Sequence, residues 1–352
     1  MPYGYKPPYN FKKYYALQMK LSILDQSIIR KGGTPAQAIA ETVETAQLAD
    51  KLGYHRFWVS EHHNSTMLAG SAPEILMVKL ADATHHIRIG SGGIMLPNHS
   101  ALKVAENFRL LETMFPGRID LGIGRAPGGD RVTAAMLNPS NTFSEESYNE
   151  QLQHLRSFFS DSAATKYGRL IAAPQSTGAP PQWILGSSAG GSGLIAARHG
   201  LGLVIARFIN PQAGTQIAEE YRTHFIPSDK FPMPRVLLAI SVICAETPEK
   251  AAALRKLSNY NILKFEKGIF EPLSPLEEIK DLEFSPDELL RIEYNSGRII
   301  SGTPPEVKQQ LSALAEEFGA EEIIVTTMTY SKADRFRSFE LLAEAFGLVR
   351  AD

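Results

Sequence analysis

The chain lacks most of the features that mark secreted, membrane-spanning or nucleic-acid-binding proteins. Its single cysteine, Cys244, excludes an internal disulfide, and no apolar run approaches the length that crosses a bilayer. A formal net charge of −2 gives no electrostatic reason to bind nucleic acid or an anionic membrane surface. The N-terminus has no apolar segment of the secretory kind, so we expect a cytoplasmic protein.

The chain also lacks an internal linker. No Gly/Ser-rich or Pro-rich stretch divides it, and 43% of its 352 residues are hydrophobic, which is enough for a large core. Residues 1–18 differ in composition from the rest, with six tyrosines or phenylalanines, three lysines and no acidic residue. We therefore predict an N-terminal arm over residues 1–18 and one folded domain over residues 19–352.

Within this domain, short apolar segments alternate regularly with helical patterns. The apolar segments predict eight strands, at residues 21–24, 56–60, 87–90, 118–122, 182–185, 201–206, 236–242 and 322–327. The first helix, for example, has Thr34 as N-cap, Pro35 in its first turn and Gly53 after its last. Eight strand–helix units favour a parallel sheet closed into a (β/α)8 TIM barrel of the α/β class. Residues 264–298, polar and broken by prolines, predict an insertion before the last strand that serves as a lid.

The second predicted strand ends in the most informative stretch of the chain. Residues 57–59 are apolar, and Glu61, His62 and His63 follow closely. Catalytic residues of α/β barrels collect at the carboxyl ends of parallel strands, so these titratable groups indicate an active site. Neighbouring residues of a strand point to opposite sides, so His62 and His63 are expected to have different roles.

Four motifs follow successive predicted strands. They are WVSEHH at 58–63, GSGGIMLPNH at 90–99, GRIDLGIGR at 117–125 and GSS at 186–188. In this order they resemble the bacterial luciferase-like flavin-dependent monooxygenases, most closely the alkanal-monooxygenase-like subgroup of luciferase-family oxidoreductases. The resemblance runs from about residue 21 to residue 346 and includes SGTP at 301–304 before a late helix.

The resemblance implies FMN bound at the C-terminal face of the barrel. His62 matches the family's active-site histidine, whose imidazole titrates near neutral pH and can donate or accept a proton. Gly92 and Gly93 match a pair that often carries a cis peptide beneath the flavin ring. The alternative for this pair is an ordinary glycine turn after a strand.

A second group of residues resembles the family's site for the FMN phosphate. Arg125 can direct two donors at a phosphate, and a helix N-terminus near Ser192 offers backbone N–H groups. The cofactor-binding residues implied are therefore Gly92, Gly93, Arg125, Ser187, Ser188 and Ser192. The serine loop is one residue longer than is usual in the family, so which serine contacts the phosphate stays open.

Two polar residues at strand ends are candidates for contacting the substrate. Asp25 follows the first predicted strand and Asn98 follows the third. An acidic residue at the position of Asp25 can equally well hold a loop in place. The substrate itself is not predicted, because loops that select it are the least constrained part of a barrel.

The resemblance also implies an activity and its partners. In this family reduced FMN reacts with dioxygen to give a C4a-peroxyflavin, which oxygenates a small organic substrate. A separate NAD(P)H:flavin reductase is expected to supply the reduced FMN, because the chain has no convincing NAD(P)H-binding unit. A homodimer is expected as well. Some relatives use the deazaflavin F420, but the Glu-His-His motif and the serine pair favour FMN.

Three other interpretations fit parts of the sequence. GSGLIA at 191–196 matches the G-x-G-x-x-A fingerprint of NAD(P)-dependent oxidoreductases, but no acidic residue closes the next strand. A metal-dependent hydrolase using Glu61, His62 and His63 is disfavoured, because contiguous residues of one strand do not converge on one ion, and no metal site is expected. A non-catalytic flavin-binding protein stays open, because fold and cofactor do not guarantee turnover.

Overall fold

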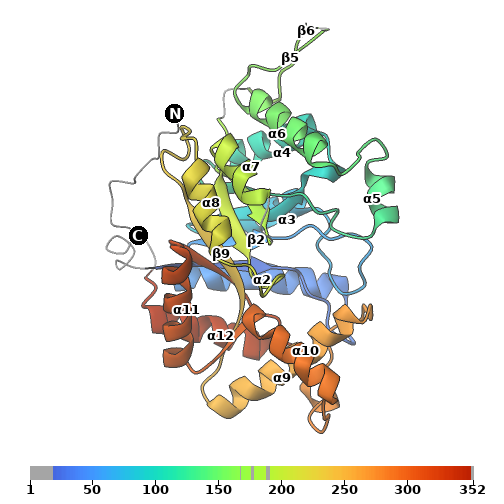
Figure 1. The fold of residues 1–352 in the computed structure, drawn as a ribbon, viewed down its shortest axis with the longest axis vertical. Coiled ribbons are helices and arrows are strands. Elements are labelled where there is room, and N and C mark those ends of the chain that lie inside the picture. The colour runs from blue at the N-terminus through green and yellow to red at the C-terminus, as the bar shows by residue number, and fades with distance from the viewer. Residues whose placement is uncertain (1–18, 167, 176–177, 188–190, 350–352) are drawn as a thin grey trace.

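Eight parallel strands of the computed structural model close into a barrel with helices around it (Figure 1). The structure describes residues 19–166, 168–175, 178–187 and 191–349, so the predicted arm and Ser188 lie outside the described residues. In ring order the strands are β1 (Lys20–Asp25), β2 (Arg56–Val59), β3 (Arg88–Met95), β4 (Ile119–Gly124), β7 (Gln182–Gly186), β8 (Gly202–Ala206), β9 (Val236–Cys244) and β11 (Glu322–Thr326). Because β11 pairs with β1 and β8 pairs with β9, the ring has no open edge. The predicted TIM barrel is confirmed.

The helix after β1 begins and ends at the predicted signals. Thr34 and Gln37 form a capping box at the start of α2, and Gly53 ends that helix with φ of 83°. The outer helices are α2 (Pro35–Leu52), α3 (Pro73–Asp82), α4 (Ala101–Met114), α6 (Glu145–Phe159), α7 (Ser192–His199), α8 (Gln216–His224), α9 (Pro248–Glu266), α11 (Pro304–Phe318) and α12 (Lys332–Phe346). None of the helices in the described ranges is long and apolar enough to cross a membrane.

The structure adds elements that the pattern did not predict. A short helix, α5 (Arg131–Leu137), lies in the polar loop after β4, where Asp130 caps it through the backbone N–H groups of Val132 and Thr133. The remaining elements are a small hairpin of β5 (Ala164–Thr165) and β6 (Gly168–Arg169), the strand β10 (Ile299–Gly302), the helix α10 (Pro286–Tyr294), and 3-10 turns at Leu96–Asn98, Leu276–Glu278 and Ser296–Arg298. The strand β10 pairs with the last residues of β9, beyond the ring.

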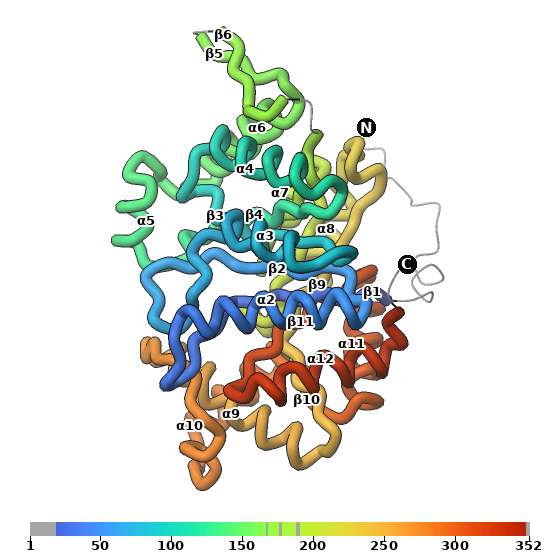
Figure 2. The backbone as a smooth tube through the Cα atoms, turned by 180° about the vertical axis from the view of Figure 1, so that it is seen from behind, coloured from blue at the N-terminus to red at the C-terminus, as the bar shows by residue number. Residues whose placement is uncertain are grey.

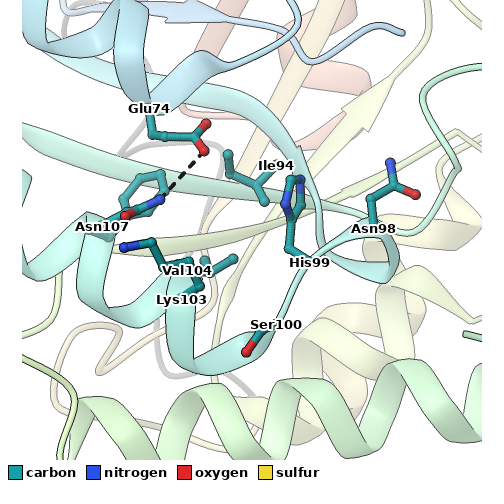
Figure 3. A pocket seen from close by; sticks show the side chains of 9 residues that line it. Glu74, Ile94, Asn98, His99, Ser100, Lys103, Val104 and Asn107 are labelled. Atoms are coloured by element: carbon teal, nitrogen blue, oxygen red, sulfur yellow. Dashed lines mark hydrogen bonds between the residues drawn. The ribbon is translucent and has the colours of Figure 1, made fainter. Parts of the chain in front are cut away.

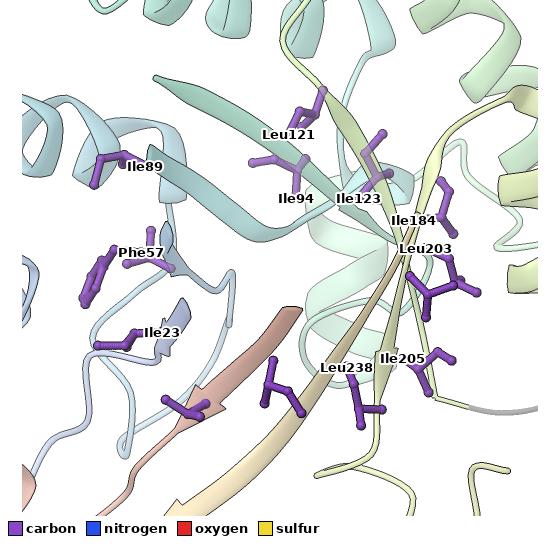
Figure 4. Packing of buried hydrophobic residues seen from close by; sticks show 14 of the residues in the cluster. Ile23, Phe57, Ile89, Ile94, Leu121, Ile123, Ile184, Leu203, Ile205 and Leu238 are labelled. Carbon is purple, nitrogen blue, oxygen red and sulfur yellow. The ribbon is translucent and has the colours of Figure 1, made fainter. Parts of the chain in front are cut away.

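Alternation along the strands divides the core into two layers. Ile23, Phe57 and Ile89 lie side by side on neighbouring strands and face the helices (Figure 4). Their chain neighbours Leu24 and Trp58 belong to a second cluster, in which residues of several barrel strands pack together. Successive residues of a strand point to opposite faces. Because both faces of these strands are buried, both sets of side chains are mostly apolar, and the strands appear in the sequence as continuous apolar runs.

Charged side chains close the N-terminal end of the barrel. Asp120 is fully buried and accepts hydrogen bonds from Arg56 at 2.8 Å and from Arg88 at 2.7 Å. Arg56 also donates to Glu322 at 2.8 Å and lies over the ring of Trp183. Burial alone would raise the pKa of Asp120, but the charges of Arg56 and Arg88 hold it below its usual value. This end is therefore a closed ionic cluster.

The predicted insertion lies against loops at the opposite, C-terminal end. Leu273 forms backbone hydrogen bonds with Ile29 and Lys31 in the loop after β1. The hydroxyl of Thr66, in the loop after β2, donates to the carbonyl of Phe270 at 3.1 Å. The helix α10 lies beyond these contacts at the lower edge of the molecule (Figure 1). The position of the insertion beside the loops after β1 and β2 is compatible with a lid, and that role stays a prediction.

Candidate active site

The C-terminal ends of β2, β3, β4 and β7 carry most of the residues singled out from the sequence. His62 follows β2, Gly92 and Gly93 lie within β3, Arg125 follows β4, and Ser187 follows β7. These strands are consecutive in the ring. Because parallel strands all end at one face, their terminal residues gather on the same side of the barrel.

The glycine pair leaves no room for side chains. The peptide bond between Gly92 and Gly93 is cis, as the resemblance implied. A Cβ at Gly92 would lie 2.7 Å from Cδ1 of Leu24, and one at Gly93 would lie 2.6 Å from Cδ1 of Leu185. Only glycine fits at these two positions without displacing a neighbour.

His62 lies in a largely buried environment. Its backbone N–H donates to the carbonyl of Gly70 at 2.9 Å, which fixes the chain as it leaves β2. Burial lowers the pKa of His62 below its usual value of 6.5, while the charge of Glu61 and the carbonyl of Gly128 oppose the shift. At neutral pH the imidazole is therefore mostly uncharged and able to accept a proton.

Glu61 is a functional candidate that sequence reasoning did not single out for a role of its own. It is 1% exposed, and its Oε1 lies 2.8 Å from Nε2 of His63 and 2.9 Å from Nε2 of His99. His62 and His63 lie in the loop after β2, which ends at Val59, so the strand alternation used to separate them does not apply, and their different roles stay a prediction. His99 is 38 residues from Glu61 in the sequence, so no local pattern links the two residues, and only the fold brings them together.

Arg125 lies beside the N-terminus of α7. The guanidinium Nη1 is 3.7 Å from where a Cβ at Gly191 would lie, and it is 3.4 Å from the carboxylate of Glu145 in a largely exposed pair. Gly191 is the N-cap of α7 and has φ of 115°. Ser192 starts this helix, and a Cβ at Gly186 would lie 2.6 Å from its Cβ, so Ser192 lies over the end of β7.

Tyr148, on α6, is the second candidate that sequence reasoning missed. The residue is 2% exposed, and its buried hydroxyl has no hydrogen-bond partner among the residues that the structure describes. Burial raises the pKa of Tyr148 well above its usual value, and the charge of Arg125 opposes that shift. A buried hydroxyl without a partner costs free energy unless another group binds it. Together with Arg125 and the start of α7, Tyr148 fits a site for a phosphate.

The two candidate substrate residues both contact protein groups. Asp25 is fully buried, and its carboxylate accepts hydrogen bonds from Arg335 at 2.6 Å and from the backbone of Ser27 at 2.6 Å. Arg335 lies on α12, which runs beside α2 (Figure 2). These contacts support the alternative role stated for Asp25, that of holding a loop.

Asn98 is turned towards Glu61 and the loop after β4. Its Nδ2 donates to the carbonyl of Pro127 at 2.8 Å and lies 3.3 Å from Oε1 of Glu61. The residue is buried, so its amide connects two loops. The substrate roles of Asp25 and Asn98 stay predictions, and neither gains support from these contacts.

The alternative interpretations find little support. The GSGLIA motif does lie at the start of a helix, but its strand, β7, is the fifth in a closed ring, whereas the dinucleotide fingerprint belongs to an open doubly wound sheet. Among the described residues, no group of three or more His, Cys, Asp or Glu side chains is arranged to hold a metal ion.

Comparison with known proteins identifies the family. Residues 19–322 match the model of the luciferase-like monooxygenase family. The chain is 45% identical to the uncharacterised protein YwcH of Bacillus subtilis over 331 residues, covering 93% of this chain and 99% of YwcH. It is 35% identical to the N-acetyl-S-alkylcysteine monooxygenase of the same organism, covering 93% and 98%. The chain therefore belongs to the luciferase-like monooxygenase family, a family of oxidoreductases.

Solved structures agree with this fold. The crystal structure of apo-MsnO8 superposes with a TM-score of 0.87 at 37% identity, covering 94% of this chain and 98% of that one. The oxygenating constituent of 3,6-diketocamphane monooxygenase from Pseudomonas putida, solved with FMN, shares the fold at 19% identity, with 93% and 97% covered and a TM-score of 0.69. An F420-dependent secondary alcohol dehydrogenase shares it at 16% identity, with 94% and 99% covered and a TM-score of 0.66. The same barrel thus serves FMN and F420 in different proteins.

Proposed function

We propose that this protein is a monooxygenase that takes up reduced FMN and inserts an oxygen atom from dioxygen into a small organic substrate. The observation that carries the proposal is the unpartnered buried hydroxyl of Tyr148, which is close enough to Arg125 to be influenced by its charge, with Arg125 itself beside the N-terminus of α7. Backbone N–H groups at a helix start, a guanidinium and a hydroxyl form a favourable donor set for a terminal phosphate. Glu145 is exposed and can leave Arg125 when an anion binds.

The remaining site residues fit the ring of the cofactor. Gly92 and Gly93 carry no side chains, so we propose that their backbone lies against the flat ring. Reduced FMN supplies the electrons that activate dioxygen. His62, mostly uncharged at neutral pH, accepts or donates a proton at its ring nitrogen, and burial around it limits access of water.

Binding of FMN and riboflavin to matched variants tests the phosphate site. We expect Arg125→Gln to weaken FMN binding roughly 10- to 100-fold, since a charge-assisted hydrogen bond contributes about 1.5–3 kcal/mol. Tyr148→Phe should weaken it by a smaller factor. Neither change should alter the affinity for riboflavin, which lacks the phosphate. Fluorescence titration measures both ligands with each variant.

The same titration has outcomes that contradict the proposal. If wild-type protein binds FMN and riboflavin equally well, the phosphate site is wrong. If it binds F420 at least ten times more tightly than FMN in either redox state, the protein is an F420-dependent oxidoreductase. Turnover by the chain alone with NADH and FMN would contradict the proposed need for a separate flavin reductase.

A homodimer is part of the proposal and has a candidate surface. Ile75 and Val78 on α3 and Leu110 and Met114 on α4 are exposed, and the two helices contact each other. Apolar residues gathered on neighbouring helices are common at interfaces between subunits. Sedimentation of wild type and of Ile75→Lys tests this surface, because a charge at a buried interface should shift the mass to that of a monomer. A wild-type monomer would contradict the proposal.

For the substrate, we propose only its class, a small organic molecule. The insertion is proposed to cover the mouth of the barrel, because its contacts with the loops after β1 and β2 place it beside the strand ends. N-acetyl-S-alkylcysteines belong in a screening panel, together with aliphatic aldehydes and cyclic ketones, since a relative that is 35% identical is a monooxygenase for that substrate class. Product formation with labelled dioxygen identifies a substrate.

A further inference from the structure

Glu61 collects hydrogen-bond donors from more than one loop. Its Oε1 contacts the ring nitrogens of His63 and His99, and its Oε2 accepts the backbone N–H of Met95 at 2.8 Å. Asn98 lies 3.3 Å from the same Oε1. A buried carboxylate with this many donors is held in its ionised form, because each donor stabilises the negative charge.

The same neighbourhood ties three loops together. The backbone N–H of His63 donates to the carbonyl of Gly128 at 2.9 Å, and Asn98 donates to the carbonyl of Pro127. Asn64 donates to Asp130 at 2.8 Å. The loops after β2, β3 and β4 thus meet around Glu61, and the first and last of them carry His62 and Arg125.

A cavity lies on the far side of His99. It has a volume of about 230 Å³ and is lined by residues of α3, β3 and α4. Glu74 and His99 stand on opposite sides of it, with Asn107 bonded to Glu74 (Figure 3). The second carboxylate oxygen of Glu74 is buried and has no partner among the described residues.

His99 therefore lies between two carboxylates. Burial alone would lower the pKa of His99, but its hydrogen bond to Glu61 and the charges of Glu61 and Glu74 raise it above 6.5. Lys103, on α4, lines the same cavity, and His63 faces Glu61 from the loop after β2. His99 is thus suited to carry the positive charge that balances Glu61 near neutral pH.

We propose that Glu61 and His99 are a positioning pair, which holds the loop bearing His62 in its working orientation and exchanges protons with solvent through the cavity beside His99. The proposal rests on the proposed function for its chemistry. Neither side chain needs to touch substrate. Because His62 lies between Glu61 and His63 in the chain, and Glu61 contacts both His63 and His99, losing these contacts would loosen the loop that carries His62.

Three variants separate positioning from plain structure. Glu61→Gln removes the charge and keeps the size, and His99→Gln keeps a donor and removes the titration. Lys103→Gln is the matched control, because it lines the same cavity without contacting Glu61. The measurements are FMN affinity, the rate at which bound reduced FMN reacts with dioxygen as a function of pH, and imidazole nitrogen spectra of protein labelled with ¹⁵N-histidine.

FMN affinity, the reaction rate with its pH profile, and the histidine spectra should each respond differently to the variants. We expect Glu61→Gln to leave FMN affinity within about threefold and to slow the reaction roughly 10- to 100-fold, as small misplacements of reacting groups do. His99→Gln should remove one limb of the pH profile. Both should move the His62 signals among the nine histidines, and Lys103→Gln should not.

An unchanged pH profile together with unchanged His62 signals in both variants would overturn the proposal. The spectra need no flavin, so they decide the positioning role even if wild-type protein binds no flavin and the proposed function fails. Should Glu61→Gln not fold, His99→Gln and His63→Gln decide the matter, because both histidines are partly exposed.

Discussion

Two clusters at opposite ends of the barrel, one around Asp120 and one around Glu61, each bury a carboxylate, but they surround it with different side chains. At the N-terminal end Asp120 and Glu322 contact Arg56 and Arg88, and at the C-terminal end Glu61 contacts histidines. Arginine keeps its charge at every pH at which the protein is folded, whereas an imidazole gains or loses charge near neutrality. The first cluster is therefore permanent, and the second responds to protons.

The two clusters lie at opposite ends of the barrel, and only the Glu61 cluster lies beside the candidate active site. The arginine cluster lies at strand starts, away from the candidate site, and its groups are satisfied by one another. The histidine cluster joins the loops after β2, β3 and β4, at the end of the barrel that carries the candidate site. In TIM barrels generally, the N-terminal face contributes stability and the C-terminal face carries activity. The clusters around Asp120 and Glu61 follow the same division, whereas Asp25, at the C-terminal end of β1, is paired with Arg335.

Breaking the permanent cluster should have the largest effect. Asp120→Asn leaves the guanidinium groups of Arg56 and Arg88 without their shared anion, so we expect the free energy of unfolding to fall by roughly 3–5 kcal/mol. Urea denaturation measures it, and the loss should be similar from pH 6 to pH 9. Arg337→Gln, in a half-exposed ion pair with Glu246, is the control and should cost about 1 kcal/mol or less. Equal losses from the two changes would mean that burial does not matter here.

His55 offers an intermediate effect at the same end. Burial lowers its pKa to about 4, so the folded protein disfavours the protonated imidazole. The unfolded chain takes up this proton near pH 6.5, and stability is therefore lost as the pH falls from 6.5 towards 4. His55→Gln should remove about 1–2 kcal/mol of that loss at pH 5. His85→Gln, an exposed histidine before β3, should leave the acid limb unchanged.

The proton-responsive cluster should give the smallest change in stability, with the opposite sign. The raised pKa of His99 means that the fold favours its protonated form, so this contribution is complete below pH 6.5 and is lost as the pH rises through the folded pKa. His99→Gln should lower stability at pH 6 by roughly 1 kcal/mol and have less effect at pH 9. Thermal melts over this range test it, and a loss that grew with pH would reverse the assignment.

The sequence predicted the barrel because its evidence is local. Short apolar runs such as residues 21–24, and helix caps such as Thr34 and Gly53, can be recognised within a few consecutive residues of the sequence. Helix α5 was missed because a seven-residue helix held mainly by its cap leaves little periodicity. The strand β10 was missed because four residues directly before the N-cap and first prolines of α11 carry no clear pattern of their own.

The candidate site also contains residues that local sequence patterns indicate and residues that they do not. His62, Gly92, Gly93 and Arg125 were singled out because they lie in motifs that resemble those of the luciferase-like family. Tyr148 and the pairing of Glu61 with His99 were not, because burial of a hydroxyl and convergence of loops appear only when distant segments meet. For Asp25, the strand-end rule predicted the position but could not foresee the ion pair with Arg335.

The crowded glycines have a consequence for how this protein could acquire new substrates. Side chains at Gly93 and Gly122 would strike backbone carbonyls of neighbouring strands, at 2.7 Å and 2.2 Å. Such atoms belong to the barrel strands and cannot move aside cheaply, so larger residues at these two positions are closed off. Directed evolution would have to work from exposed positions such as Phe265 and Phe270, which are more than half exposed and pack edge-on against each other.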